Sequence, residues 1–337
     1  KIEKQAKKIL HSSNIYRIKP QEECAKKIVE LSTYDMQCFF CNSGAEANET
    51  AIKLARKYGN VTFKTPKYKI ITIKNSFHGR TIATLKATAQ EDKHKYFAPY
   101  PDGFVYANDI NEAITMIDDT TVGVMLELIQ GEGGIFMQDI FQVQRLERIL
   151  KEKKLLLIID EVQTGVYRSG NFLISQYFGI KPDIVTLAKG LASGIPIGVM
   201  MTSLKDIFTF GDHGSTFGGN HLSTTVCKAV LKILEKYSNS GKLGENIKYF
   251  NSCLQYFTDK YPNIFLQKNG WGFMQGLVLK NENDLSNIVN FALKNGVLVL
   301  KSGKNIIRFL PPIVISKKEI KEGFKRFEEL IINYHKI

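Results

Sequence analysis

The stretches LLLIIDEVQTGVYRSG, residues 155–170, and DIVTLAKG, residues 183–190, decide the fold of this chain. Each contains a continuous apolar run that stops at a charged residue, Asp160 in the first and Lys189 in the second. Such runs predict strands that are buried on both faces, as in a parallel sheet covered by helices. Because ligands bind beyond the carboxyl ends of the strands in open α/β sheets, we expect Asp160 and Lys189 to meet in one crevice.

Asp160 and Lys189 together indicate a particular chemistry. A buried carboxylate that holds a ring nitrogen protonated, near a lysine that can form a Schiff base, is the minimum equipment of a pyridoxal-phosphate enzyme. Either motif alone is weak, because Asp-Glu is common at helix starts and Lys-Gly is an ordinary turn. The interpretation therefore depends on which other residues converge on the same crevice.

The composition is typical of a folded chain with more than one core. Its 337 residues are 44% hydrophobic, which is enough for one large core and a second, smaller one. No apolar run reaches the length of about 18 residues that a membrane span needs, so we expect no membrane contact. The opening KIEKQAKKIL is typical of a basic amphipathic helix and not of a signal peptide, which predicts a cytoplasmic location.

The cysteines and the net charge argue against two other classes of protein. The five cysteines are scattered and odd in number, unlike a disulfide framework. Cys38 and Cys41 have C-x-x-C spacing, but no second Cys or His pair follows at zinc-site distance, so we expect buried thiols and no metal site. The net charge of +13 is spread along the chain without a basic and aromatic stripe, so we expect no nucleic-acid partner.

The first candidate for an anion-binding site is the motif NSGAEANE, which follows a predicted strand, 37–41. Ser43, Gly44 and Ala45 stand at the start of a predicted helix, 45–58. Backbone N–H groups and the helix dipole favour an anion at such a position. A helix that is simply capped by a serine is an equally good interpretation.

Two further motifs follow predicted strands. In NSFHGRT, after the strand 69–73, Phe77 can stack on a cofactor ring and Arg80 can bind a carboxylate with two parallel hydrogen bonds. Core packing for Phe77 and a surface charge for Arg80 are the ordinary alternatives. A later buried strand ends in ELIQGEGG, whose Glu127 and Glu132 can bring an acid to the crevice.

The order of predicted strands and helices indicates an α/β fold with two domains. Strands and helices alternate as far as a long helix that ends near residue 237, which indicates a mainly parallel central sheet. Residues 16–236 are predicted to form this large domain, and residues 237–337 a smaller α+β C-terminal domain. Residues 1–15 are predicted to form an N-terminal segment that packs with the small domain.

Seven motifs, taken together and in order, resemble those of the class III pyridoxal-phosphate-dependent aminotransferases. They are NSGAEANE, FHGRT, IQGEGG, DEVQTG, LAKG, GSTFGGN and RFLPP, and they cover nearly the whole chain. The resemblance implies the fold type I of pyridoxal-phosphate-dependent transferases. It also implies that a further N-terminal segment, present in relatives, is missing from this sequence.

The resemblance implies roles for individual residues around pyridoxal 5'-phosphate. Lys189 would carry the cofactor as a Schiff base and move a proton during catalysis, while Asp160 would keep the pyridine nitrogen protonated. Thr216 would reach the cofactor phosphate of a partner subunit, which implies a homodimer with active sites at the interface. The cofactor-binding residues implied are Ser43, Gly44, Ala45, Phe77, His78, Asp160, Val162, Gln163, Lys189 and Thr216.

Three residues are implied to bind the substrates. Arg80 would bind the α-carboxylate of the amino donor, and Arg308 that of 2-oxoglutarate. Glu132 would mask Arg308 while the donor is bound, because an uncompensated buried arginine costs about 3–5 kcal/mol.

The implied reaction moves the terminal amine of N-acetylornithine to 2-oxoglutarate, which gives N-acetylglutamate semialdehyde and glutamate, a step of arginine biosynthesis. Ornithine, succinylornithine, succinyl-diaminopimelate and 4-aminobutyrate stay open as donors within the same family. A lyase or racemase on the same fold would share Lys189 and Asp160 without needing the pair of Glu132 and Arg308.

Overall fold

The computed structural model describes residues 1–335, which form two compact units. The division follows the predicted two-domain plan, but two short segments from the middle of the chain belong to the second unit. The first unit contains Lys1–Leu128, Gln138–Val166 and Asn171–Ile233, and the second contains Ile129–Met137, Tyr167–Gly170 and the chain from Leu234 onward.

The first unit is built on a seven-stranded sheet, which confirms the predicted α/β fold with a mainly parallel sheet. The strand β9 runs antiparallel to both of its neighbours, and all other neighbouring strands are parallel. The strand order is β1 (Gln37–Cys41), β9 (Gly198–Thr202), β8 (Ile184–Leu187), β7 (Leu156–Asp160), β4 (Thr121–Leu126), β2 (Lys69–Ile73) and β3 (Phe104–Ala107).

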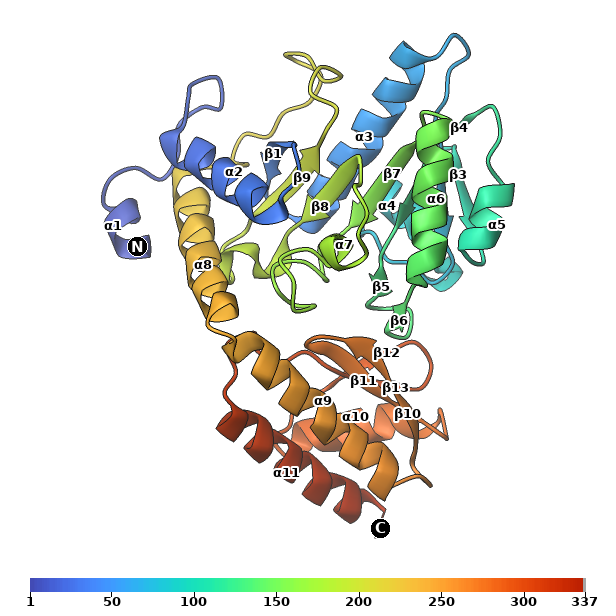
Figure 1. Cartoon of the computed structure of the whole chain (residues 1–337), viewed down its shortest axis with the longest axis vertical. Helices are drawn as coiled ribbons and strands as arrows, with labels where there is room; N and C mark the ends of the chain where they lie inside the picture. Colours follow the sequence, from blue (N-terminus) through green and yellow to red (C-terminus); the bar gives the residue numbers. More distant parts are fainter. Residues whose placement is uncertain (336–337) are drawn as a thin grey trace. The chain divides into compact units, whose positions relative to one another are not determined.

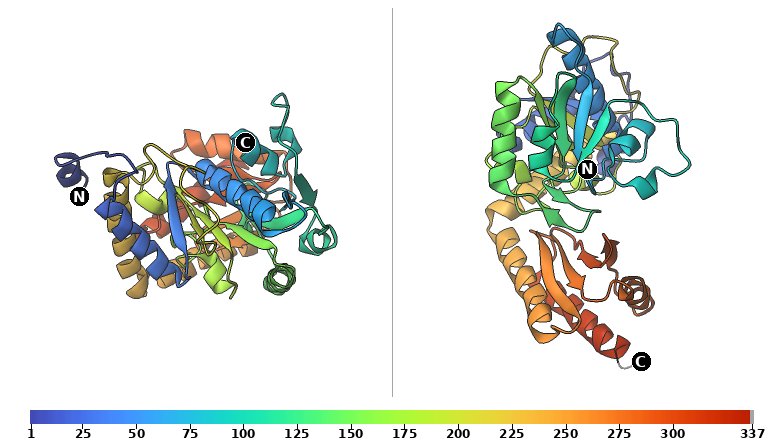
Figure 2. Two further views of the ribbon diagram at one scale, coloured as in Figure 1. Left: turned by 90° about the horizontal axis from the view of Figure 1, so that it is seen from above. Right: turned by 90° about the vertical axis from the view of Figure 1, so that its right-hand side faces the viewer.

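Helices cover both faces of this sheet (Figures 1 and 2). The helix α3 packs on β8 and β9, and α6 packs on β7 from the opposite face. The helices of the first unit are α1 (Ile2–Ala6), α2 (Lys19–Ser32), α3 (Gly44–Thr62), α4 (Ile82–Ala87), α5 (Ile110–Thr115), α6 (Ile140–Glu152) and α7 (Ile174–Tyr177), with 3-10 turns η1 (Glu91–Lys93) and η2 (Lys189–Ala192). The helix α8 (His221–Asn239) begins in the first unit and ends in the second.

The central strands β7 and β8 form because their residues are apolar on both faces. Leu156 and Ile158 of β7 join the core under α3, together with Ile52 and Leu54 of that helix. Every residue of β7 and β8 is buried, as predicted for strands covered on both sides. The register pairs Asp160 with Thr186, so β7 and β8 end at the same edge of the sheet.

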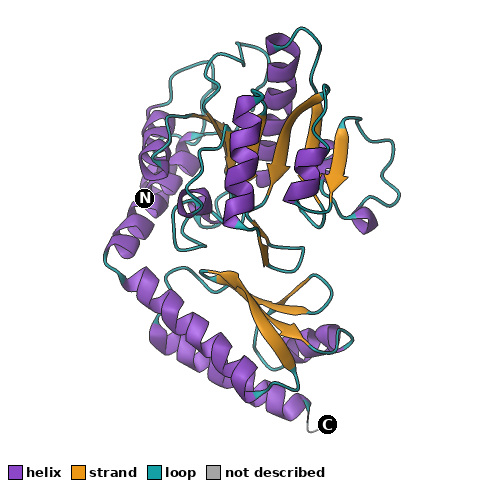
Figure 3. Ribbon diagram, turned by 45° about the vertical axis from the view of Figure 1, so that its right-hand side comes forward, coloured by secondary structure: helices purple, strands orange, loops and turns teal. Residues whose placement is uncertain are grey.

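The second unit is an α+β unit with a four-stranded antiparallel sheet (Figure 3). The helix α9 packs on β10 and β11, α10 packs on β12 and β13, and α11 packs on α9 and α10. Its elements are the strand pair β5 (Ile129–Gln130) and β6 (Phe136–Met137), α9 (Lys242–Lys260), β10 (Phe265–Trp271), β11 (Met274–Leu279), α10 (Asp284–Lys294), β12 (Leu300–Ser302), β13 (Ile306–Phe309) and α11 (Lys317–Tyr334).

Residues 1–15 group with the first unit, whereas the sequence predicts that they pack with the small domain. The side-chain amide of Asn14 explains this position. Its Nδ2 donates hydrogen bonds to the carbonyl oxygens of Ser215, at 2.7 Å, and Gly218, at 2.8 Å. Both acceptors belong to the first unit, and an attachment of this kind between residues distant in sequence leaves no periodic signal in the chain.

None of the helices in the described part of the chain combines the length and the apolar composition needed to cross a bilayer.

The carboxyl group of Asp183 fastens β8 to β7 at the strand ends opposite Asp160. It accepts the backbone N–H of Leu157 at 2.8 Å. The pKa of Asp183 is raised from 3.8 to about 6, chiefly by burial, against the opposing effect of the hydrogen bond from Leu157 and with a smaller contribution from the charge of Glu147. The folded chain therefore holds this proton more tightly than the unfolded chain does.

We expect the stability of the protein to fall as the pH rises from about 4 to about 6, because Asp183 loses its proton at a higher pH in the folded state than in the unfolded state. The substitution Asp183→Asn should remove this part of the pH dependence and stabilise the protein at pH 7 by at most about 3 kcal/mol. Chemical unfolding at several pH values measures both effects. The exposed Asp259 gives the control Asp259→Asn, which should keep the pH dependence of the unsubstituted protein.

Candidate active site

A cavity of about 470 Å³ lies at the edge of the sheet where β7 and β8 end. It brings together all the predicted site residues of the first unit except Thr216. The predicted residues that line it are Ser43, Gly44, Ala45, Phe77, His78, Arg80, Asp160, Val162, Gln163 and Lys189.

Asp160 is the last residue of β7 and has a buried carboxylate that is 4% exposed. Its Oδ2 accepts hydrogen bonds from Nδ2 of Asn48 and from Nδ1 of His78, both at 2.8 Å. Its Oδ1 accepts the backbone N–H of Val162 at 3.0 Å. These donors are an amide, an imidazole and a peptide N–H, so they hold the carboxyl group in one orientation without being permanent cations.

Lys189 follows directly after β8 and Ala188, and its side chain is exposed in the cavity. Its φ of 46° lies in the left-handed region, which is unusual for a residue other than glycine. Backbone strain of this kind persists only where the surrounding structure imposes it, and it is concentrated at functional sites. Because β7 and β8 are neighbours, the fold brings Lys189 into the same cavity as Asp160, as the two sequence stretches predicted.

The helix α3 begins at the cavity wall. Ser43 caps the helix by accepting the N–H of Glu46 at 3.2 Å, and the Glu46 carboxylate accepts the N–H of Asn42 at 2.7 Å. The N–H groups of Gly44 and Ala45 belong to the first turn, where the helix itself provides no acceptor. This end of the cavity is therefore suited to an anion.

Gly44 is required by the close approach of α3 to the loop after β7. A Cβ atom on Gly44 would lie 2.7 Å from Cγ1 and 3.1 Å from Cγ2 of Val162. The missing side chain thus lets the helix start and the Val162 side chain form one continuous wall.

The FHGR segment forms another part of the wall. The backbone N–H of Phe77 donates to the buried carboxylate of Glu127 at 2.9 Å. The guanidinium carbon of Arg80 lies 5.7 Å from the centre of the Phe77 ring, and the Arg80 side chain is exposed. His78 is buried, and among the described residues its Nε2 has no hydrogen-bond partner.

The predicted pair of Glu132 and Arg308 lies in the second unit, and the two side chains contact each other there. Nη1 of Arg308 donates to Oε1 of Glu132 at 2.9 Å and to the carbonyl oxygen of Gly131 at 2.6 Å. The Arg308 side chain is 7% exposed and that of Glu132 is 34% exposed. A buried cation is thus covered by a carboxylate that solvent can reach.

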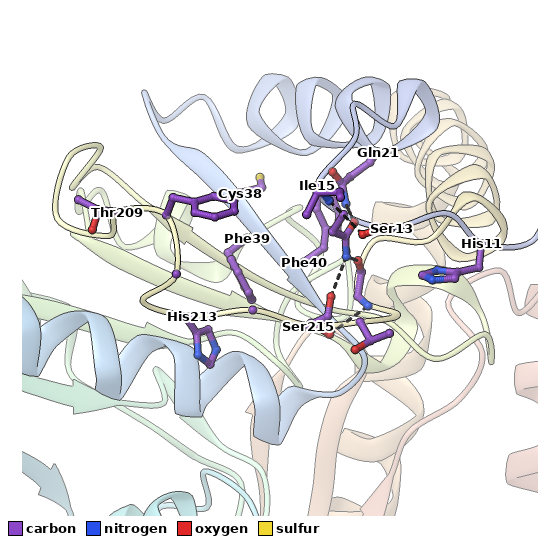
Figure 4. Close-up of a pocket in the computed structure, with 16 residues that line it drawn as sticks. His11, Ser13, Ile15, Gln21, Cys38, Phe39, Phe40, Thr209, His213 and Ser215 are labelled. Atoms are coloured by element: carbon purple, nitrogen blue, oxygen red, sulfur yellow. Dashed lines mark hydrogen bonds between the residues drawn. The ribbon is translucent and has the colours of Figure 1, made fainter.

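Thr216 lines a different cavity of the first unit, with a volume of about 700 Å³ (Figure 4). Figure 4 shows that the N-terminal residues His11, Ser13 and Ile15 line this cavity together with Ser215. The structure therefore does not bring Thr216 together with the other predicted cofactor-binding residues of its own chain.

Two buried polar residues that line the first cavity have no predicted role. Asn48 bonds to Asp160, and Glu127 was recognised as an acid at a strand end but received no role. Both are polar residues that are almost fully buried. Asn48 lies on the buried face of α3 between Ala47 and Ala51, and this polar interruption of an apolar helix face is the signal that sequence reasoning can use.

The chain matches a known family over nearly all its length. The sequence model of the family Aminotransferase class-III matches residues 1–331. The acetylornithine aminotransferase of Wolinella succinogenes is 52% identical over 328 residues, which are 97% of this chain and 84% of that protein.

Two solved structures have the same fold. The ornithine aminotransferase from Toxoplasma gondii superposes with a TM-score of 0.92 at 27% identity, and the match covers 99% of this chain and 82% of that one. The N-acetylornithine aminotransferase from Stenotrophomonas maltophilia has a TM-score of 0.83 at 30% identity, with coverage of 99% and 85%.

We expect Gly44→Ala to destabilise the protein by about 1–3 kcal/mol, because the new methyl group would overlap the Val162 side chain. The double substitution Gly44→Ala and Val162→Ala should recover most of this loss by removing the overlapping atoms. Chemical unfolding measures the effect. Gly244→Ala is the matched control, since a Cβ there meets no atom within 4 Å and the residue is also helical. Equal destabilisation by the single and the double substitution would contradict the steric explanation.

Proposed function

The chain belongs to the class III aminotransferases, and we propose that it transfers the terminal amine of N-acetylornithine to 2-oxoglutarate, giving N-acetylglutamate semialdehyde and glutamate. The observation that carries this proposal is the cavity in which Asp160, Lys189 and the start of α3 meet. The choice of donor is supported by the relatives that act on acetylornithine, to which this chain is up to 52% identical. The reaction is a step of arginine biosynthesis.

Class III aminotransferases depend on pyridoxal 5'-phosphate, and the residues of the cavity fit this cofactor. The N–H groups of Gly44 and Ala45, next to the Ser43 cap, suit a phosphate group. The buried Asp160 carboxylate suits a protonated ring nitrogen. When bound, the cofactor supplies an electron sink for the carbon that loses its proton. The buried and unpaired Nε2 of His78 leaves one further polar atom for a ligand among the described residues.

Each remaining cofactor residue has a proposed task. Phe77 and Val162 would enclose the two faces of the ring, and Gln163 would lie near its phenolic oxygen. Lys189 would hold the cofactor through Nζ and, once the amine of the donor has taken its place, move a proton from the donor carbon. Such proton transfer by a positioned side chain contributes about 10²–10⁴-fold to the rate.

The substrate carboxylates would be bound by two arginines. Arg80 would bind the α-carboxylate of the donor, for which its exposed guanidinium is accessible. Arg308 would bind 2-oxoglutarate after Glu132 moves aside, and the 2.9 Å contact of this pair supports a carboxylate that covers the arginine in the meantime. Covering matters because an uncompensated buried charge is costly.

The second cavity supports the proposed homodimer. Thr216 is exposed there, and the neighbouring aromatic side chain of Phe210 is 96% exposed. Phe217, next in sequence, is also exposed and packs on His11 at a ring distance of 4.9 Å. Exposed apolar groups gathered in this way are typical of protein–protein interfaces. In the dimer, Thr216 would reach the cofactor phosphate of the partner subunit.

The enzyme would work in the cytoplasm. It would need neither a membrane nor a nucleic acid as a partner.

Ornithine is the main alternative donor, because the solved ornithine aminotransferase from Toxoplasma gondii matches the fold with a TM-score of 0.92. Succinylornithine, succinyl-diaminopimelate and 4-aminobutyrate are the other alternative donors, and a single-turnover measurement compares all of them with N-acetylornithine. A lyase or racemase is distinguished from all of them because it would not form glutamate from 2-oxoglutarate.

We expect N-acetylornithine to bleach the visible band of the cofactor-loaded protein rapidly in a single turnover without 2-oxoglutarate. Ornithine and 4-aminobutyrate also carry a terminal amine but lack the acetylated α-amine of the proposed donor, so they should bleach the band more slowly. Stopped-flow absorbance measures the rates, and Lys189→Ala is the inactive control. Addition of 2-oxoglutarate should restore the band and yield glutamate. A band that no donor bleaches would exclude these substrates.

We expect Glu132→Gln to change the discrimination between donor and acceptor by about tenfold or more, since Arg308 then lacks its covering charge. The KM for 2-oxoglutarate should fall, and kcat/KM for N-acetylornithine should fall as well. Steady-state kinetics of the two half-reactions measure this shift.

Glu245→Gln is the control for Glu132→Gln, because it removes the charge of an exposed pair with Lys317 in the second unit. It should leave both constants unchanged. Unchanged discrimination in Glu132→Gln would contradict the proposed covering role.

A further inference from the structure

Asn48 occupies an unusual position for an amide side chain. It lies on α3, is 1% exposed, and is flanked on the helix by the buried Ala47 and Ala51. Burying an amide in apolar surroundings is costly unless its hydrogen bonds are made. A polar residue retained at such a place therefore needs partners that justify it.

The partners of Asn48 determine which way its amide points. Its Nδ2 donates to Oδ2 of Asp160 at 2.8 Å and to the backbone carbonyl of His78 at 2.6 Å. Both partners are acceptors, so only the NH2 side of the amide can face them. The Oδ1 of Asn48 is buried and has no hydrogen-bond partner among the residues that the structure describes. The side chain is thus fixed by its two donor bonds alone.

Asn48 joins three parts of the cavity. It lies on the same helix as Gly44, four residues further on, which is about 6 Å along the axis at 1.5 Å per residue. One helical segment therefore carries both the N–H groups at the anion-binding end and the amide that holds Asp160. Through the carbonyl of His78, the same amide also fixes the FHGR segment.

We propose that Asn48 is a positioning residue that keeps the Asp160 carboxylate aimed at the ring nitrogen of the bound cofactor. The inference rests on the proposed function, because it takes pyridoxal 5'-phosphate as the ligand of the cavity. His78 provides the second donor to the same oxygen, and Val162 fixes the other oxygen. In this role Asn48 acts through Asp160, to which its Nδ2 donates.

The test compares two ligands with the cofactor-free protein. One is pyridoxal 5'-phosphate, and the other is its 1-deaza analogue, in which a carbon replaces the ring nitrogen. A hydrogen bond to a charged group is worth enough to change an affinity about ten- to a hundredfold. We expect Asn48→Ala to raise the Kd of pyridoxal 5'-phosphate by this factor and to change that of the analogue much less. Equilibrium titration followed by absorbance measures both constants.

Asn246→Ala is the matched control. Asn246 is also a buried asparagine, and its Nδ2 also donates two hydrogen bonds, to the Tyr237 hydroxyl and the Ile315 carbonyl, both at 2.7 Å. Because Asn246 lies in the second unit, Asn246→Ala should lower the stability of the protein without changing the ratio of the two dissociation constants. If Asn48→Ala does not fold, the isosteric Asn48→Asp replaces it. The second carboxylate beside Asp160 should again change the dissociation constants of the two ligands by different factors.

The outcomes separate this inference from the function on which it rests. Equal weakening of both ligands by the Asn48 substitution, or no weakening at all, would overturn the role of Asn48 while leaving the aminotransferase intact. An unsubstituted protein that binds no pyridoxal 5'-phosphate would instead overturn the proposed function.

Discussion

The site depends on one buried carboxylate, that of Asp160, and on the hydrogen bonds that hold it. A carboxyl group that is 4% exposed is stable only if other groups replace the hydrogen bonds to water that it has lost. Asn48, His78 and Val162 do so from three different segments of the chain. Because these donors come from α3, the FHGR segment and the loop after β7, the carboxylate and the fold around it constrain each other.

The parallel arrangement of β7 and β8 explains why a lysine shares the cavity with this carboxylate. Two neighbouring parallel strands end at the same edge of the sheet, and the register of Asp160 with Thr186 leaves Lys189 just beyond the end of β8. The helix α3 packs on β8 and starts at the same edge. A helix start that is suited to an anion, a carboxylate and an amine therefore meet without any long loop to hold them.

The buried side chains of Asp160 and Arg308 have different kinds of partner. In the first unit Asp160 accepts hydrogen bonds from an amide, an imidazole and a peptide N–H, whereas in the second Arg308 contacts the carboxylate of Glu132.

The segments Ile129–Met137 and Tyr167–Gly170 belong to the second unit because their hydrogen-bond partners lie there. Gly131 accepts hydrogen bonds from Ser302 and Arg308, and Arg168 donates to the carbonyl oxygens of Phe273 and Pro311.

The sequence by itself determined the strands that carry Asp160 and Lys189, because continuous apolar runs ending in a charge are a local property of the chain. It also determined the capped start of α3 and the mainly parallel sheet, since alternation of strands and helices is visible in one dimension. Only the tertiary structure decided the bond from Asn48 to Asp160, the attachment of Asn14 to Ser215 and Gly218, and the separation of Thr216 from the other predicted cofactor-binding residues of its chain. The antiparallel direction of β9 belongs to the same group. Each of these features depends on how residues far apart in sequence are placed relative to one another in space, and no local periodicity encodes that placement.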